Sequence, residues 1–203
     1  MNTVSDKKNQ PPAPGQLYVI SAPSGGGKTS LTRALIERLA AKGRTARFSV
    51  SYTTRDPREG ERDGVDYHFV SMNGFKQMIA DAAFLEHARV FDRYYGTSKA
   101  ETERWLAAGQ DVILDIDWQG AEQVRARAPD AVTIFISPPS RQELERRLRS
   151  RASDDEAAIT KRLAEADDEM ARAGDYDHQI VNDAFEHALA ELQAIFEGTA
   201  RSA

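Results

Sequence analysis

The chain has 203 residues, of which 40% are hydrophobic and 29% are charged, as is typical of a globular protein with one full core. It contains no cysteine, which excludes disulfides and thiolate metal sites, and its formal net charge of −5 argues against a general binder of nucleic acid. No apolar run approaches the roughly 18 residues of a membrane span, so a membrane is not expected as a partner either.

The N-terminal segment, residues 1–16, reads MNTVSDKKNQPPAPGQ and contains three prolines among polar residues. It lacks the apolar segment of a signal peptide. We expect a disordered tail and a cytoplasmic protein.

The segment that follows the tail predicts a strand, a glycine-rich loop and a helix, in that order. The strand is the apolar run LYVIS at residues 17–21. The helix lies within residues 29–43, where Leu31, Leu35 and Leu39 are four residues apart and share one face. A strand, a glycine loop and a helix are the context that a phosphate-binding loop requires.

The loop itself, Ala22–Ser30, is called the phosphate loop below. It matches the pattern G-x-x-x-x-G-K-[ST], except that Ala22 stands where the first glycine belongs. Its three glycines allow backbone N–H groups to turn around a phosphate chain, Lys28 can reach the terminal phosphates, and the Thr29 hydroxyl suits Mg²⁺. The alternative is a glycine-rich turn that precedes a solvated lysine.

Strands alternate with helices over the rest of the chain. Strand patterns occur at residues 44–52, 66–70, 84–98, 111–117, 131–137 and 178–182. Helical patterns occur at residues 74–84, 99–110, 121–128, 141–151, 153–173 and 185–196. This alternation predicts an α/β protein with a parallel sheet flanked by helices. Residues 53–64 are dense in Arg, Pro, Gly and Asp, so we expect residues 51–98 to form an inserted lobe.

Two groups of polar residues are candidates for chemistry. Asp115 and Asp117 end the run DVILDID, and a carboxylate at the end of a parallel strand can orient the water shell of Mg²⁺. Arg55 and Arg58 form a fork suited to a phosphate dianion. The alternatives are exposed acids at a strand end and a solvated charged surface.

The motifs resemble guanylate kinase in their order and spacing over residues 17–196. They are SAPSGGGKTSL, FSVSYTTRDPREGERDGVDYHFV, FLEH, YYGTS, LDIDWQG, IFISPPS and IVND. Bacterial-type members of that family are similar to this chain in having alanine at the position of Ala22. The resemblance implies an enzyme of guanine nucleotide synthesis and salvage that transfers the γ-phosphoryl group of ATP to GMP, with Mg²⁺, to give ADP and GDP.

The resemblance also implies an organisation. A P-loop NTPase-type parallel sheet carries an inserted mixed α+β lobe for GMP and a helical lid. The core with the phosphate loop would be residues 17–50, the GMP-binding lobe 51–98, further core 99–140, the lid 141–165 and the remaining core 166–203. Oligomeric state is not determined by the sequence, and acceptance of dGMP is left open.

By the same resemblance, residues acquire roles. The GMP phosphate would be held by Ser51, Arg55, Arg58, Tyr67 and Tyr95. The guanine base would be read by Glu86, Thr97 and Asp117. ATP would contact Ala22, Pro23, Ser24, Gly25, Gly26, Gly27, Lys28, Thr29, Ser30 and Asn182. Mg²⁺ would be bound, partly through water, by Thr29 and Asp115. The catalytic set would be Lys28, Arg55, Arg58, Arg147, Arg151 and Arg162.

Guanine presents N1–H and a 2-amino group as adjacent donors, and one carboxylate such as Glu86 can accept from both. From the residues alone, an exposed strand glutamate is the favoured interpretation of Glu86, and only the resemblance assigns it to the base. The lid arginines, Arg147, Arg151 and Arg162, also read as charges on helix surfaces. Many family members have glycine after Arg151, whereas this chain has Ala152.

Three other functions are consistent with parts of this pattern. A catalytically inactive guanylate-kinase-like binding module would lack an intact phosphate loop. A phosphotransferase with another phosphorylated acceptor would not need the base-reading set at Glu86. A generic GTPase would carry an N-K-x-D segment, which we do not find downstream of the loop.

Overall fold

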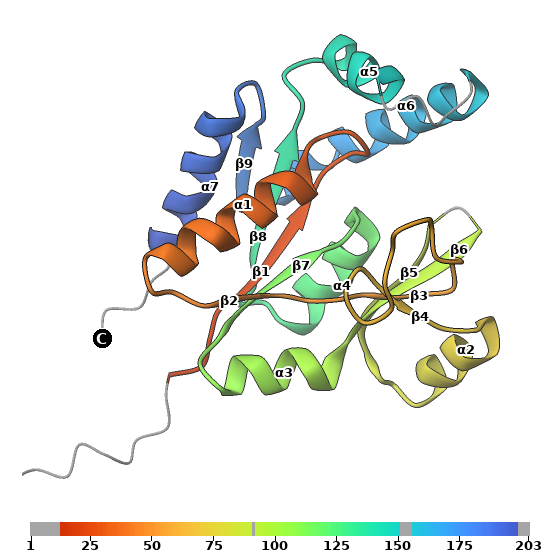
Figure 1. Ribbon diagram of the computed structural model, residues 1–203, viewed down its shortest axis with the longest axis vertical. Helices are drawn as coiled ribbons and strands as arrows, with labels where there is room; N and C mark the ends of the chain where they lie inside the picture. Colours follow the sequence, from red (N-terminus) through yellow and green to blue (C-terminus); the bar gives the residue numbers. More distant parts are fainter. Residues whose placement is uncertain (1–12, 91, 151–155, 199–203) are drawn as a thin grey trace, which may run out of the picture.

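A parallel sheet of five strands, three of which are mostly apolar and buried, forms the centre of the protein (Figure 1). The computed structural model describes residues 13–90, 92–150 and 156–198. The strand order is β2-β7-β1-β8-β9, and every neighbouring pair is parallel. The strands are β1 (Leu17–Ser21), β2 (Ala46–Phe48), β7 (Asp111–Asp115), β8 (Val132–Ser137) and β9 (His178–Val181). The predicted parallel α/β architecture is confirmed.

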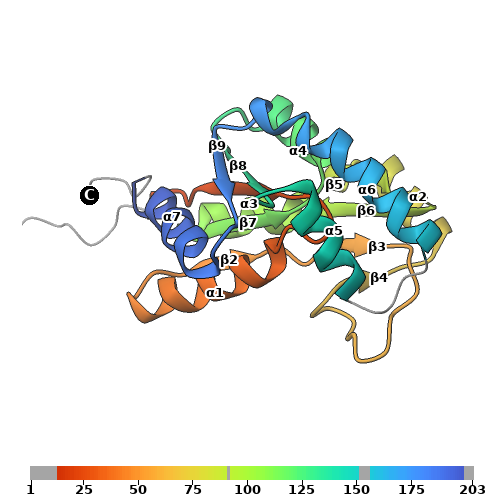
Figure 2. The ribbon, with the colours of Figure 1, turned by 90° about the horizontal axis from the view of Figure 1, so that it is seen from above.

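Helices cover both faces of this sheet, as the view from above shows (Figure 2). One face carries α1 (Lys28–Ala41) and α7 (Phe185–Gly198), and Tyr18 of β1 stacks there on Phe196 with 3.7 Å between ring centroids. The opposite face carries α3 (Lys99–Ala107), α4 (Trp118–Arg127) and the end of α6 (Glu156–Met170). Side chains of a strand alternate between faces, so β1 contributes to both cores.

A second, mixed sheet is formed by the segment between β2 and α3. Its order is β4-β3-β6-β5, with β3 (Tyr52–Thr53), β4 (His68–Phe69), β5 (Phe84–Val90) and β6 (Arg93–Ser98). Strands β5 and β6 are an antiparallel hairpin, whereas β3 and β4 are parallel. Helix α2 (Met72–Ala80) packs on it through Phe75, which stacks on Phe84 at 4.5 Å. The predicted inserted mixed sheet is therefore present.

The single strand predicted over residues 44–52 is wrong. The chain pairs with β7 only as far as Phe48, and from Tyr52 it pairs with Gly96 of β6 in the other sheet. Both halves of the segment alternate apolar and polar side chains, so the pattern does not reveal that the pairing partner changes between them.

Helix α5 (Arg141–Ser150) and the N-terminal part of α6 project beyond the edge of the central sheet at which its strands end (Figure 1). Helix α5 packs on α6 through a small apolar core of Leu144, Leu148, Ile159, Leu163 and Ala166. A 3₁₀ turn at Ala173–Asp175 leads from α6 to β9. Residues 151–155, which belong to the predicted lid, lie outside the described residues.

A search of the described residues finds no helix long and apolar enough to cross a membrane.

The stacked pair of Tyr18 and Phe196 should be a large contributor to the stability of the central core. Phe196 has an exposed fraction of 0%, so we expect Phe196→Ala to lower the free energy of unfolding by about 3–5 kcal/mol, through lost burial and the cavity left behind. Phe185→Ala is the matched control, because Phe185 of the same helix is 41% exposed and should cost about 1 kcal/mol or less. Equal losses in urea denaturation for the two variants would contradict this assignment.

Candidate active site

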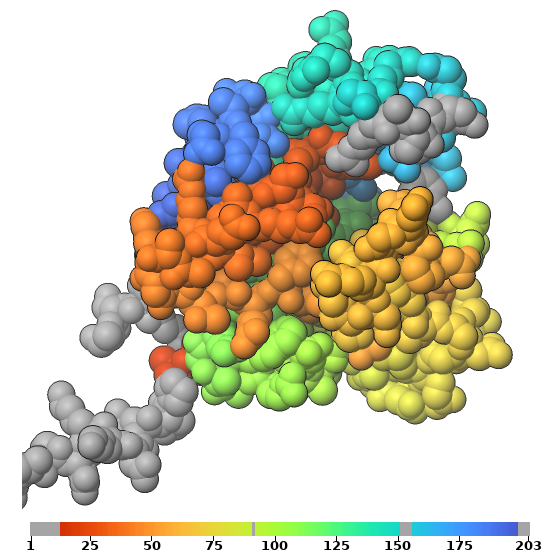
Figure 3. Space-filling model, viewed as in Figure 1, coloured from red at the N-terminus to blue at the C-terminus, as the bar shows by residue number. Residues whose placement is uncertain are grey.

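A cavity of about 380 Å³ lies between the phosphate loop, α6 and the segment that leads into the mixed sheet. Figure 3 shows a hollow between the orange N-terminal segment, the yellow segment and the cyan helix. The predicted site residues that line the cavity are Ala22, Pro23, Ser24, Gly25, Gly27, Lys28, Thr29, Ser30, Arg58, Tyr67, Asp117 and Arg162. Residues that are more than 100 positions apart in the sequence therefore share one site.

The phosphate loop has the backbone that its glycines predict. Gly25 and Gly27 have φ of 94° and 93°, in the left-handed region that side chains disfavour. Among the described residues, Ala82 is the one non-glycine residue with positive φ, so Ala22 fits its position without this strain. Gly27 caps α1, whose free N–H groups and positive dipole end face the loop. The loop is thus shaped to receive an anion.

Lys28 and Thr29 converge on Asp115 at the end of β7. Lys28 Nζ lies 2.5 Å from Asp115 Oδ1 and donates to the carbonyl of Ile116 at 3.1 Å. The Thr29 hydroxyl donates to Asp115 Oδ2 at 3.3 Å. Burial lowers the pKa of Lys28, but the ion pair and hydrogen bond with Asp115, together with the charges of Glu169 and Asp117, outweigh it, so the pKa is raised overall and the ammonium stays charged.

A second cavity of about 190 Å³ adjoins the first, and Lys28, Tyr67 and Asp117 line both. Its remaining predicted site residues are Ser51, Glu86, Tyr95 and Asp115. The mixed sheet supplies one wall and the ends of the central strands supply the other. Lys28 therefore lies between two cavities that are lined by different residues.

Glu86 is the most deeply buried acid of the second cavity, with an exposed fraction of 2%. Burial raises its pKa to about 7, although a hydrogen bond of 2.6 Å from the Thr97 hydroxyl to Oε1 favours the ionised form. Oε2 lies against Gly120 of α4, where a Cβ would be only 2.5 Å away. Asp117 caps that helix by accepting from the Gly120 N–H at 2.9 Å.

Glu61, which the sequence did not mark as a site residue, holds the segment that carries the two predicted phosphate-binding arginines. Its carboxylate accepts from both terminal nitrogens of Arg55, at 2.8 and 2.9 Å, and from the backbone N–H of Arg58 at 2.7 Å. The Arg55 guanidinium also lies 5.2 Å from the Tyr67 ring centroid. Glu61 thereby fixes the turn that carries both cations.

Two predicted site residues, Arg147 and Asn182, line neither of these two cavities. Arg147 donates to Glu143 and to the backbone carbonyl of Asn182, and the Asn182 side chain donates to Gly26. Arg151 lies outside the described residues. Asn182 is thus placed behind the phosphate loop, with Arg147 above it.

Helix α6 adds two acids to the first cavity, Glu165 and Glu169. The sequence analysis predicted the charged helix but did not identify these two as site residues. They are four residues apart, so they lie on one face, and this spacing was the available signal. Glu169 Oε2 is buried and has no hydrogen-bond partner within the part of the chain that the structure describes. Burial raises the pKa of Glu169 to about 7, against the opposing charge of Lys28.

Comparison with known proteins identifies similar chains. The guanylate kinase family model matches residues 14–199. The guanylate kinase of Chromohalobacter salexigens is 55% identical over 186 residues, covering 92% of this chain and 85% of the relative. That of Escherichia coli strain K12 is 53% identical over 183 residues, covering 90% and 87%. The crystal structure of guanylate kinase from Anaplasma phagocytophilum matches with a TM-score of 0.75 at 31% identity, covering 94% and 88%.

The close approach of Gly120 to Glu86 generates a prediction. We expect Gly120→Ala to force the Glu86 carboxylate from its place and to destabilise the protein by about 1–3 kcal/mol, as overpacking does. Gly174→Ala is the control, because nothing lies within 4 Å of a Cβ there. Thermal unfolding of both variants measures the effect. If the clash with Glu86 is the cause, Gly120→Ala should cost little stability in a protein that already carries Glu86→Ala. An equal loss of stability in both backgrounds would contradict the steric explanation.

Proposed function

This chain belongs to the guanylate kinase family and transfers the γ-phosphoryl group of ATP to GMP, and we propose how its own residues divide that work. The observation that carries the proposal is the pair of adjoining cavities that share Lys28. The alternatives raised by the sequence, an inactive binding module, a kinase of another acceptor and a generic GTPase, are set aside by the family match.

ATP occupies the first cavity in this proposal, with its phosphates on the phosphate loop. The left-handed glycines and the free N–H groups of α1 support this, because they offer donors to an anion without a side-chain barrier. Lys28, held between Asp115 and the Ile116 carbonyl, is preorganised to reach the terminal phosphates.

GMP occupies the second cavity, with guanine at Glu86. An ionised Glu86 accepts from guanine N1–H and the 2-amino group, and Thr97 and Asp117 complete the base site. Adenine has no donor at N1, so it would leave a buried carboxylate facing a lone pair, at a cost that supports discrimination of roughly 10⁴-fold. The deep burial of Glu86 strengthens this argument, because water cannot replace the missing donor.

The GMP phosphate lies toward Arg58 and Arg55, with the hydroxyls of Ser51, Tyr67 and Tyr95 as further donors. Arg58 lines the ATP cavity and Tyr67 lines both cavities, so a phosphate held by them faces the phosphate loop. The phosphate oxygen of GMP is already an anion, and positioning beside the γ-phosphoryl group replaces the need for a general base.

Mg²⁺ is part of the proposal, with Thr29 and Asp115 as the residues that would hold it. A hydroxyl and a carboxylate are the hard oxygen donors that this ion prefers. Mg²⁺ keeps several of its waters and takes further ligands from substrate phosphates, so two protein ligands suffice in this proposal. When bound, Mg²⁺ neutralises charge on the transferred group.

Residues 51–98 act as the GMP-binding lobe and residues 141–165 as the lid in this proposal. Arg162 lines the ATP cavity and is placed to stabilise the charge of the transferred group. Arg147 joins it only after α5 moves, because Arg147 is engaged by Glu143 and Asn182. Closure of this kind also excludes water from ATP.

The experiment that tests this function is a coupled assay of ADP release from ATP and Mg²⁺, with GMP, dGMP, AMP, UMP and CMP offered separately. We expect turnover with GMP, none with AMP, UMP or CMP, and a direct answer for dGMP. Equal turnover with AMP would contradict the role of Glu86.

Loss of the shared lysine should slow the reaction sharply. We expect Lys28→Met to lower kcat by about 10²–10³-fold or more, because a preorganised charge at the transferred group is removed. Lys76→Met, on the exposed side of α2, is the control and should retain wild-type kcat. Near-normal turnover in Lys28→Met would overturn the assignment.

The raised pKa of Glu86 predicts that GMP binding depends on pH. Guanine requires the ionised carboxylate, which predominates above pH 7, so affinity should fall about tenfold between pH 8 and pH 6. The GMP phosphate also protonates, with a pKa near 6. Glu86→Gln removes the titration of the carboxylate, so its pH profile reports the GMP phosphate alone. The difference between the two profiles is then due to Glu86. Calorimetry of GMP binding should therefore give a steeper profile for the wild type; identical profiles would contradict the prediction.

A further inference from the structure

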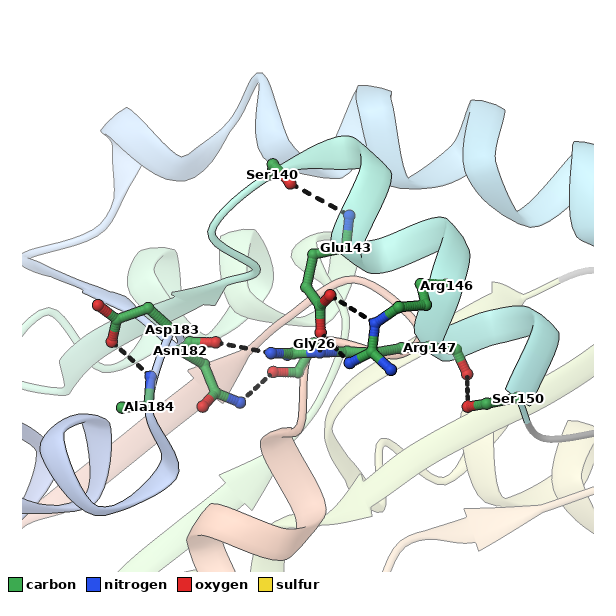
Figure 4. Close-up of polar contacts among 9 residues, drawn as sticks. All are labelled: Gly26, Ser140, Glu143, Arg146, Arg147, Ser150, Asn182, Asp183 and Ala184. Atoms are coloured by element: carbon green, nitrogen blue, oxygen red, sulfur yellow. Dashed lines mark hydrogen bonds and ion pairs between the residues drawn. The ribbon is translucent and has the colours of Figure 1, made fainter.

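Asn182 follows β9 and uses three of its polar groups to join separate parts of the molecule (Figure 4). Its backbone N–H donates to the Ser137 carbonyl of β8 at 2.8 Å. Its side-chain amide donates to the Gly26 carbonyl at 2.8 Å, and its backbone carbonyl accepts from Arg147 Nη2 at 2.9 Å. Only 6% of the residue is exposed.

The contact with Gly26 sets the orientation of a peptide plane in the phosphate loop. In a trans peptide the carbonyl of Gly26 and the N–H of Gly27 point in opposite directions. Because Asn182 holds the carbonyl behind the loop, the Gly27 N–H is directed to the other side. A Cβ at Gly27 would lie 2.3 Å from Asn182 Nδ2, so the amide is packed directly on the loop backbone.

The contact with Arg147 connects the same residue to α5. Glu143 accepts from Arg147 Nε at 2.8 Å and so aligns the guanidinium with the Asn182 carbonyl. Helix α5 also packs on the loop itself, since a Cβ at Gly25 would lie 3.0 Å from Leu144 Cδ1. Asn182 therefore links the orientation of the loop to the position of α5.

We infer that Asn182 is a positioning residue for the phosphoryl donor: it orients the Gly26–Gly27 peptide plane toward the phosphates and joins that plane to α5 through Arg147. This rests on the proposed function, in which the loop binds the phosphates of ATP. It differs from the expectation, stated above, that Asn182 contacts ATP directly. The buried amide is already committed to Gly26.

The test compares ATP with tripolyphosphate, which has the phosphate chain but neither base nor sugar. Calorimetry should show that Asn182→Ala weakens binding of both ligands by a similar factor, about 3- to 10-fold, as expected for one net hydrogen bond. Asn73→Ala removes the same atoms from an exposed position on α2 and should change neither affinity. Weakening of ATP alone would overturn the inference in favour of a base contact, and no weakening of either ligand would also overturn it.

A second readout does not depend on any ligand. Hydrogen exchange of the amides of Gly25–Lys28 should be faster in ligand-free Asn182→Ala than in the wild type or Asn73→Ala. Unchanged exchange would overturn the inference. Asn182→Asp keeps the size of the side chain but replaces the donor with an acceptor, and it should give the same result if Asn182→Ala does not fold.

The two proposals fail in different ways. If the wild type binds neither ATP nor tripolyphosphate, or if Lys28→Met still binds both normally, the proposed donor site is wrong. If the wild type binds both and Lys28→Met weakens both, while Asn182→Ala behaves as wild type, only the role of Asn182 is wrong.

Discussion

The parallel pairing of β1 with β7 is the constraint on which the site depends. Ile20 pairs with Asp115, so the loop after β1 and the carboxylate that ends β7 emerge at the same edge of the sheet. The Lys28–Asp115 ion pair is formed there, and the hydroxyl of Ser21 donates to the carbonyl of Ile116 beside it. Because both strands are buried, a shift in their register would cost apolar burial on both faces and would separate the lysine from its partner.

Features encoded by neighbouring residues could be predicted from the sequence. The strand, loop and helix of the phosphate loop follow from an apolar run, three glycines and leucines four residues apart. The class of fold follows from the alternation of strands and helices. The acids at the end of β7 could be identified as a candidate site, because the ends of parallel strands collect at one edge.

Features that depend on contacts between distant residues could not be predicted from the sequence. Gly120 looks ordinary in its helix until Glu86, 34 positions earlier, is found against it. Asn182 reaches a carbonyl 156 positions away, and no local pattern marks that contact. The split of residues 44–52 between two sheets likewise depends on which strand is available at each point, and side-chain alternation does not carry this information.

The pairing of Arg55 with Glu61 has a consequence for ligand design. The guanidinium already holds a carboxylate by two short bonds, so an incoming phosphate exchanges one anion for another and gains only the difference. A small anionic fragment directed at Arg55 would therefore gain little from its charge in the ligand-free protein. Inhibitors that grow outward from the buried end at Glu86 avoid this competition.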